Sequence, residues 1–176
     1  KLNAASGGGS FSLQAPSSSA NNRVFTLPDS ADATLLTSTS SVGKVLQVVE
    51  STSSTTVTTS GGTEADLLTL SITPSSSSNK VLVFINFVGQ SNPTSVAKAW
   101  IRLYRGTSSG TLIRTLKDGT NDATITYHTI SGQKLDSPNT TSAQTYTMTL
   151  ARLGSGTNTV STDGNPYFLQ AMEIAA

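Results

Sequence analysis

The segment Lys80–Val88, with the sequence KVLVFINFV, limits the fold of this chain more than any other. Seven of its nine residues are apolar, and Asn86 is the only polar residue between them. β-Branched and aromatic residues favour a strand over a helix, and Gly89 closes the run. A strand with one face in water alternates apolar and polar residues, and this segment does not. We therefore expect a β-strand that is covered on both faces.

The composition favours extended structure along the whole chain. Serine and threonine together make up about a third of the 176 residues, whereas charged residues are 12% and hydrophobic residues 35%. Chains that are rich in threonine and punctuated by glycine suit β-strands with small polar side chains facing water. No segment repeats apolar residues at the period of a helix.

Charge and cysteine content exclude several classes of function. The net charge is +1 and the lysines and arginines are scattered singly, so we expect no nucleic-acid partner and no membrane insertion. There is no cysteine, which excludes disulfides and thiolate metal sites. No apolar run approaches the roughly 20 residues that a transmembrane helix needs. The chain begins at Lys1 without a methionine or a signal peptide, so we expect that upstream sequence is missing.

Residues 1–43 differ from the rest of the chain. They contain three short pieces of extended character, Phe11–Pro16, Arg23–Asp29 and Thr34–Thr37, separated by turn-forming residues. Their few apolar residues cannot close a core within one chain. We expect an extended leader that is ordered by packing against copies of itself, with a flexible leader as the alternative.

From Lys44 onward the pattern predicts a dense series of strands. Several alternate cleanly, such as the segment in which Leu68, Leu70 and Ile72 are separated by Thr69 and Ser71. Polar turns join the strands, so residues 44–176 are predicted to form an all-β antiparallel β-sandwich, most simply a jelly roll. The predicted strands are Lys44–Glu50, Thr55–Thr59, Asp66–Thr73, Lys80–Val88, Ala97–Arg105, Thr111–Thr115, Thr124–Ser131, Gln144–Leu153 and Pro166–Ile174, with a weaker one at Thr157–Ser161.

The second apolar face of Lys80–Val88 predicts contact between copies of the chain, because one sandwich has too little apolar surface to cover both faces. The strand Ala97–Arg105 carries a tryptophan, an arginine and a tyrosine on one face, the residue types that interface centres select. Ordinary packing at the rim of the core is the alternative for Trp100. We expect this aromatic face to lie beside the outer face of Lys80–Val88. The predicted interface residues are Phe84, Phe87, Trp100, Arg102 and Tyr104.

Motifs that suggest catalysis are weak. Residues Gly106–Gly110 read Gly-Thr-Ser-Ser-Gly and match the pattern G-x-S-x-G, but a nucleophile elbow needs a strand before it and a helix after it. Strand-like sequence flanks both sides here, so we expect a hairpin and no catalytic role for Ser108. No pair among the ten acidic residues stands out for glycoside hydrolysis. We therefore predict no catalytic residues and no cofactor.

Metal sites are also not indicated. His128 is the only histidine, which excludes most histidine-paired sites within one chain. Residues Asp118–Asp122 space oxygen ligands as in part of a calcium loop, but the glutamate that completes such a loop is absent. A solvated turn is the expectation for this segment and for Asp163–Asn165. Asn139 begins an N-glycosylation sequon, which matters only in a eukaryotic secretory setting.

Two sets of short motifs occur in a fixed order along the chain. The leader contains Leu13–Pro16, Arg23–Asp29 and Leu35–Thr37, followed by the junction Gly43–Val49. The following domain contains Leu70–Pro74 with a serine run and Lys80–Val83, then Arg102–Gly106, Leu135–Thr141 and the terminal Met172–Ile174. With these motifs the chain resembles, over nearly its whole length, the distal part of tailed-phage fibres or related virion appendages of marine and cyanobacterial phages. Phe25 and Ser38 depart from the usual form of the leader.

This resemblance implies a homotrimeric virion component with a jelly roll of the tumour-necrosis-factor-like type. The function it implies is a fibre tip that adheres to a glycan or protein on the bacterial surface and joins other virion proteins through upstream sequence. A structural head fibre or capsid decoration without a receptor is the alternative, and a glycan depolymerase or a eukaryotic signalling ligand is a lesser one. Loops at the ends of a rigid sandwich are the expected contacts. The residues predicted to contact the receptor are Ser91, Asn92, Ser108, Ser109, Asp118, Asn121, Asp163 and Asn165.

Overall fold

The computed structural model describes residues 2–3, 10–11, 18, 43–60, 63–92, 97–120, 126–154, 157–160 and 164–176. The chain divides into two compact units, Lys1–Leu36 and Thr37–Ala176. In the first unit, β1 (Leu2–Asn3) pairs with β2 (Ser10–Phe11) in antiparallel fashion. The rest of the predicted leader lies outside the described residues, so its predicted ordering by self-association remains a prediction.

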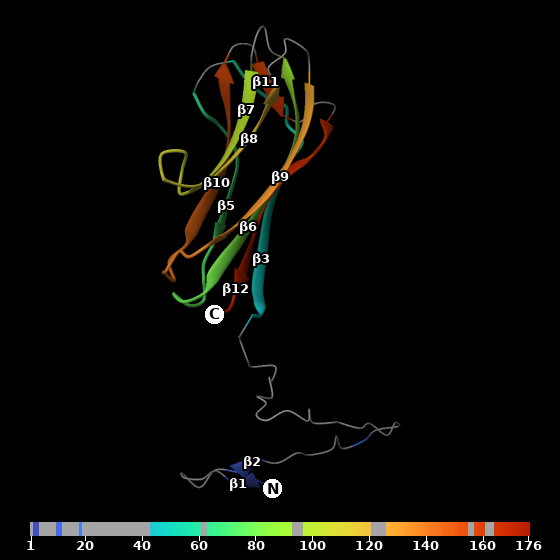
Figure 1. The fold of residues 1–176 in the computed structure, drawn as a ribbon. Helices are drawn as coiled ribbons and strands as arrows, with labels where there is room; N and C mark the ends of the chain where they lie inside the picture. Colours follow the sequence, from blue (N-terminus) through green and yellow to red (C-terminus); the bar gives the residue numbers. More distant parts are fainter. Residues whose placement is uncertain are drawn as a thin grey trace. The chain divides into compact units, whose positions relative to one another are not determined.

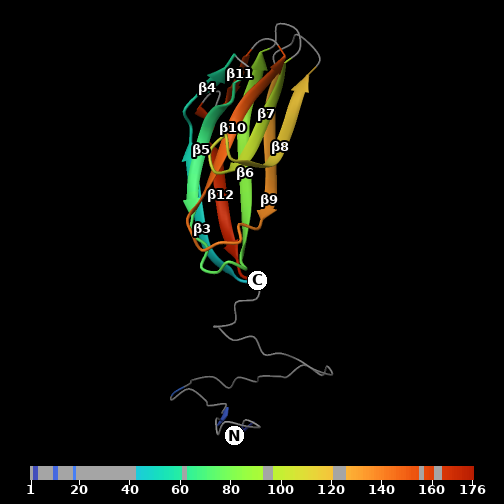
Figure 2. The same ribbon diagram turned by 90° about the vertical axis from the view of Figure 1, so that its left-hand side faces the viewer.

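The described part of the second unit is built from strands (Figures 1 and 2). None of its residues lies in an α-helix, and no helix in the described part of the chain is long and apolar enough to cross a membrane. The strands are β3 (Val45–Ser53), β4 (Val57–Thr59), β5 (Ala65–Ile72), β6 (Lys80–Asn92), β7 (Ala97–Arg105), β8 (Thr111–Thr120), β9 (Thr126–Asp136), β10 (Gln144–Gly154), β11 (Thr157–Val160) and β12 (Tyr167–Ile174).

These strands form two antiparallel sheets. One sheet has the order β5-β10-β7-β8, and the other has the order β3-β12-β6-β11-β4, with β9 pairing the remaining side of β6. The predicted all-β antiparallel sandwich is therefore confirmed. Apart from the short strands β4 and β11, the two sheets are β3-β12-β6-β9 and β5-β10-β7-β8. Numbered one to eight along the chain, these strands follow the orders 1-8-3-6 and 2-7-4-5, which are those of a jelly roll.

Four strands run at least three residues further than their local sequence predicts, and the first of them, β3, reaches Ser53 rather than Glu50. Strand β6 continues through Gly89 to Asn92, β8 continues through the predicted turn at Asp118-Gly119, and β9 reaches Asp136. Pairing with neighbouring strands explains the differences, since Lys98 on β7 pairs with Gly119. Backbone hydrogen bonds to a partner strand outweigh the turn preference of Asp-Gly.

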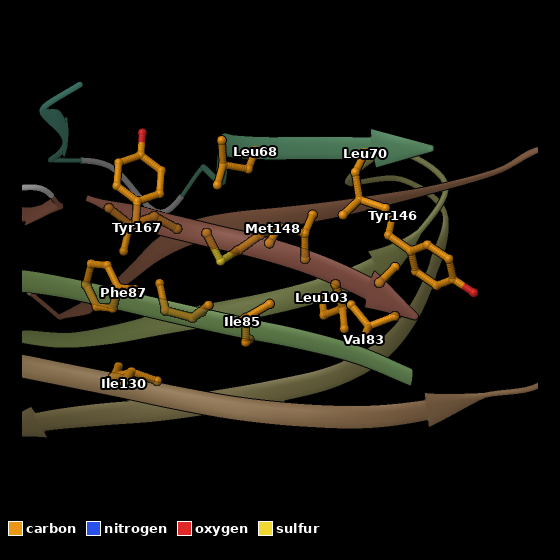
Figure 3. Close-up of a cluster of buried hydrophobic side chains, with 14 of the residues drawn as sticks. Leu68, Leu70, Val83, Ile85, Phe87, Leu103, Ile130, Tyr146, Met148 and Tyr167 are labelled. Atoms are coloured by element: carbon orange, nitrogen blue, oxygen red, sulfur yellow. The ribbon is translucent and has the colours of Figure 1, made fainter. Parts of the chain in front are cut away.

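The core lies between the two sheets and follows the alternation of the strands (Figure 3). On β6, Val81, Val83, Ile85 and Phe87 point inward and are at most 2% exposed. Burial of each such side chain stabilises the fold by about 1.5–3 kcal/mol. The same cluster takes in residues from the facing sheet, including Leu68, Leu70, Ile101, Leu103, Met148 and Leu150.

A buried carboxylate secures the end of the sandwich where the chain enters at Gly43. Glu173 on β12 is 1% exposed and accepts hydrogen bonds from Asn79 Nδ2 (2.6 Å), Gln47 Nε2 (2.6 Å), Ser75 N (2.6 Å) and Ser75 Oγ (2.8 Å). Burial by itself raises the pKa of Glu173, but these hydrogen bonds outweigh it and lower the pKa to about 2. The ionised side chain thus ties β3 and the β5–β6 turn to β12.

Candidate functional site

The outward face of β6 carries apolar side chains that its own sheet leaves half exposed. Leu82, Phe84 and Val88 alternate with the buried residues of the same strand and point away from the core. Asn86 is the polar residue between them. The second apolar face expected for Lys80–Val88 is therefore present.

The strand register extends this apolar surface across four strands. Val48 on β3 pairs with Met172 on β12, Met172 pairs with Leu82, and Leu82 pairs with Leu135 on β9. The two outer members of this row, Val48 and Leu135, are 51% and 52% exposed. Side chains directly opposite one another in antiparallel strands lie about 5 Å apart, so the row forms a continuous apolar band.

Further outward-facing residues enlarge this band. Leu46 and Ile174 lie on the side of the band nearer Gly43. Phe84 and Phe168 lie on its other side. On that side Gln170 also donates a hydrogen bond to Glu50 (2.8 Å). We refer to the outward-facing residues Leu46, Val48, Leu82, Phe84, Leu135, Phe168, Met172 and Ile174 as the apolar face.

The predicted interface residues fall into three different environments. Phe84 lies on the apolar face, whereas Phe87 is 1% exposed inside the core and presents no surface to a second copy. The assignment of Phe87 to an interface is therefore wrong, because its parity on β6 points it inward. Trp100, Arg102 and Tyr104 lie on the other sheet, so they do not lie beside Phe84 within one chain. Their place in an interface between copies stays a prediction.

The outward face of β7 is closed by side chains of the same chain. Arg102 forms an ion pair with Glu64, and its guanidinium carbon lies 4.6 Å from the centre of the Trp100 ring. Glu64 also accepts hydrogen bonds from the hydroxyls of Tyr104 (2.9 Å) and Thr149 (2.9 Å), and Tyr104 is 7% exposed. Packing within one chain, the alternative considered for Trp100, accounts for this cluster.

The predicted receptor-contact residues divide between one end of the sandwich and a hairpin. Ser91 and Asn92 end β6, Asp118 lies near the end of β8, and the exposed Asn165 precedes β12; all four lie at the end opposite Gly43 (Figure 1). Ser108 and Ser109 lie in the β7–β8 hairpin, which projects from the side of the sandwich (Figure 1). Asn121 and Asp163 lie outside the described residues.

The Gly106–Gly110 segment is a hairpin between β7 and β8, as predicted, and lacks the helix of a nucleophile elbow. The Thr107 and Ser109 hydroxyls hydrogen-bond each other (2.9 Å), and Gly110 N donates to Thr107 O (2.8 Å). Gly106 has a φ of 95°, which favours glycine at this corner. Within the described part of the chain, no group of three histidine or acidic side chains is placed to hold a metal ion. The side chains of His128 and Asp118 fall outside that part.

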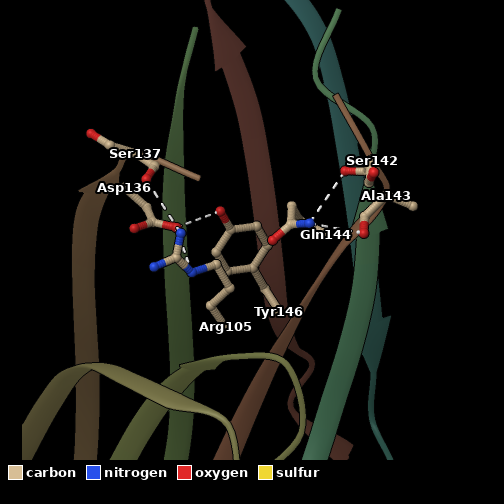
Figure 4. A network of polar contacts seen from close by, with 7 residues as sticks. All are labelled: Arg105, Asp136, Ser137, Ser142, Ala143, Gln144 and Tyr146. Atoms are coloured by element: carbon tan, nitrogen blue, oxygen red, sulfur yellow. Dashed lines mark hydrogen bonds and ion pairs between the residues drawn. The ribbon is translucent and has the colours of Figure 1, made fainter. Parts of the chain in front are cut away.

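A second polar network lies next to this hairpin (Figure 4). Tyr146 Oη donates to Asp136 Oδ2 (2.7 Å), and Arg105 Nε lies 3.6 Å from the same oxygen. Arg105 Nη1 also donates to the carbonyl of Ser137 (3.3 Å). Burial, with the hydrogen bond to Asp136, raises the pKa of the Tyr146 hydroxyl, which therefore stays a neutral donor.

An open hollow of about 420 Å³ adjoins this network. It lies between the start of the β7–β8 hairpin and the start of β10. Its walls are formed by Arg105, Gly106, Thr111, Ala143, Gln144 and Thr145.

Glu64, Asp136, Glu173 and the hollow were not anticipated from the sequence, since each depends on residues distant in the chain. The apolar face had a visible signal. Strands β3 and β12, like β6, carry apolar residues at both parities, as in Val45-Leu46 and Val48-Val49 on β3 and in Phe168-Leu169 and Ala171-Met172 on β12. Such a pattern predicts that both faces of these strands are covered, as it does for Lys80–Val88.

Comparisons with known proteins give structural likeness alone. No family model and no curated protein sequence matches the chain. Among solved structures, infectious bursal disease virus strain Gx aligns with a TM-score of 0.41 and 15% identity over 74% of this chain and 37% of that one. The VP2 subviral particle of the same virus aligns with a TM-score of 0.39 and 13% identity over 74% and 38%. This chain thus spans less than half the length of those viral chains.

A third solved structure comes from Bacillus endospore appendages, described as disulfide-linked pili. It aligns with a TM-score of 0.35 and 13% identity over 81% of this chain and 100% of that one. The present chain has no cysteine.

Proposed function

We propose that the chain is a structural module of a phage virion appendage, which assembles with copies of itself through the apolar face. The observation that carries the proposal is the continuous row Val48–Met172–Leu82–Leu135 on the outside of a complete sandwich. The jelly-roll core is already filled without these side chains, so their exposure needs a partner outside the sandwich.

The dimensions of the apolar face suit an interface between copies. It spans four strands, or about 14 Å between the outer strand axes, and about 20 Å along β12 from Phe168 to Ile174. With side chains included, its area is on the order of 500 Å², at the upper end of the largest patches on monomers. A standard interface buries about 800 Å² per partner, with an apolar centre and a polar rim. Glu50, Gln133 and Gln170 supply polar residues around Phe84.

A second copy is the occupant best matched to this face. The net charge of +1 removes any long-range repulsion between copies, and the flat, two-dimensional band is suited to another sheet rather than to a small ligand. The resemblance to phage fibres favours three copies in the assembly.

Adhesion to a glycan or protein of the bacterial surface is the second part of the proposal. The chain enters the sandwich at Gly43, and the ends of β6, β8 and the start of β12 lie at the opposite end. If the residues before Gly43 point towards the virion, the opposite end of the sandwich points outward, together with Ser91, Asn92, Asp118 and Asn165.

The test of adhesion uses the fluorescently labelled protein and a panel of bacterial strains. We expect saturable binding to at least one strain, and we expect excess unlabelled protein to block adsorption of the parent phage to that strain. Absence of binding to a strain that the parent phage infects, with no block of adsorption, overturns the adhesive role and leaves a structural head fibre or decoration protein.

A further inference from the structure

The hollow beside Arg105 combines groups that bind hydroxyl-rich ligands. Its volume of about 420 Å³ lies within the range of about 300–1,000 Å³ that small-molecule sites occupy. A guanidinium, a carboxamide and two threonine hydroxyls line it, and these groups both donate and accept hydrogen bonds. Gly106 leaves room in the wall because it has no side chain, although its N–H and carbonyl are already hydrogen-bonded to Thr145 and Thr147, and Ala143 adds an apolar contact.

Two of the polar side chains of the hollow, Arg105 and Gln144, have partners within the chain. Arg105 is fixed from behind by Asp136 and by the Ser137 carbonyl, and Gln144 Nε2 donates to the carbonyls of Ser142 (3.3 Å) and Ala143 (3.0 Å). Gly106 N donates to the Thr145 carbonyl (2.7 Å), which joins the two walls. Side chains that are already ordered lose little entropy on binding.

The charge of the hollow favours a neutral ligand over an anion. Arg105 supplies the positive charge, and Asp136, which is 8% exposed, compensates it at 3.6 Å. None of the six lining residues carries a carboxylate, so the hollow also lacks the pair of acids that glycoside hydrolysis needs.

We propose that this hollow is a binding site for a neutral saccharide, separate from the strand ends at the end of the sandwich opposite Gly43. Planar polar side chains and hydroxyls match the alternating donors and acceptors of a sugar ring, and Ala143 supplies an apolar contact for its C–H groups. The site binds and does not cleave. The inference deepens the proposed adhesion by naming a ligand class, and the Ser108–Ser109 hairpin borders the site.

Saturation-transfer NMR on the purified full chain tests the proposal. The probes are glucose, galactose, mannose, rhamnose, N-acetylglucosamine and disaccharides of these sugars, each at millimolar concentration. We expect transfer to at least one probe. Thr145→Trp, which fills the hollow from an exposed position on β10, is expected to weaken that signal at least about tenfold. The matched control Thr141→Trp lies in the neighbouring loop outside the hollow and is expected to keep it.

The proposal is overturned if no probe receives transfer from the wild-type protein, or if Thr145→Trp and Thr141→Trp bind equally well. Circular dichroism of both variants shows that each is folded, and Gln144→Ala provides a second, smaller change in the same wall. Saccharide binding without adsorption to cells removes the adhesive role and keeps the site. Adsorption to cells without saccharide binding overturns the saccharide site and keeps the adhesive role.

Discussion

At the scale of single residues, the two phenylalanines of β6 show how parity on a strand decides a role. Phe84 and Phe87 are three positions apart, so they point to opposite faces of the sheet. The sequence predicted that both faces of this strand are apolar, but it left open which of the two faces the core. Both parities of KVLVFINFV are mainly apolar, with Asn86 the one polar residue among Leu82, Phe84 and Val88. The position of the second sheet decides which of the two faces is buried in the core.

Substitution of these two residues is expected to separate assembly from folding. Phe84→Asp places a charge on the apolar face and is expected to give a folded monomer, since the core is untouched. Phe87→Ala removes a fully buried ring and is expected to cost about 3–5 kcal/mol of unfolding free energy. Light scattering and urea denaturation measure the two effects. A Phe84→Asp protein that stays assembled contradicts the role of this residue.

Glu173 is expected to make the stability depend on acid pH. Its pKa falls from about 4.5 in the unfolded chain to about 2 in the folded chain, so the unfolded state binds more protons between these values. The stabilisation is complete above pH 4.5 and is lost as the pH falls towards 2, with a magnitude of up to about 3 kcal/mol. Urea unfolding of wild type and Glu173→Gln checks this. We expect the difference between them to shrink below pH 4.5, and a difference that stays constant down to pH 2.5 contradicts the assignment.

At the scale of elements, β6 changes partner part-way along its length. Its first part pairs with β12, and from Gly89 to Asn92 it pairs with β11. The sequence predicted a strand end at Gly89, since glycine commonly closes a strand. The structure shows instead a point of close approach, where a β-carbon would lie 2.5 Å from the Thr159 carbonyl oxygen on β11.

Two glycine substitutions test this close approach. Gly89→Ala is expected to destabilise the protein by about 1–3 kcal/mol or more, because the Thr159 carbonyl belongs to a paired backbone and cannot move away. Gly132→Ala on β9 is the matched control, since its new β-carbon meets the Leu116 side chain at 2.5 Å and that side chain can adopt another rotamer. Chemical denaturation gives both values. Equal losses in the two variants contradict the special position of Gly89.

The strand pattern itself was largely predictable from sequence. Alternation, together with the continuous apolar run Lys80–Val88, located the strands β3 to β12, with errors only at their ends, and the turn spacing indicated a jelly roll. The ends were missed where residues distant in sequence extend a strand, as at Asp118-Gly119 on β8. The Arg102–Glu64 pair and the Glu173 network were missed for the same reason, since Glu173 and Gln47 are 126 positions apart.

At the scale of the whole molecule, the motifs that carry the resemblance to phage fibres coincide with the two polar networks. The junction containing Gln47 and the terminal segment containing Glu173 meet at the carboxylate of Glu173. The segments containing Arg105 and Asp136 meet at the carboxylate of Asp136. Each network thus joins segments that are distant in the sequence, and each depends on a carboxylate that is at most 8% exposed.

The central claim is that copies of this module associate through the apolar face. Light scattering coupled to gel filtration tests it directly on the 18.2 kDa chain and on Leu82→Asp, which places a charge in the middle of the Val48–Met172–Leu82–Leu135 row. We predict a mass three times that of the chain for the wild type and the mass of a single folded chain for Leu82→Asp. A monomeric wild type, or a Leu82→Asp protein that assembles as the wild type does, contradicts the claim.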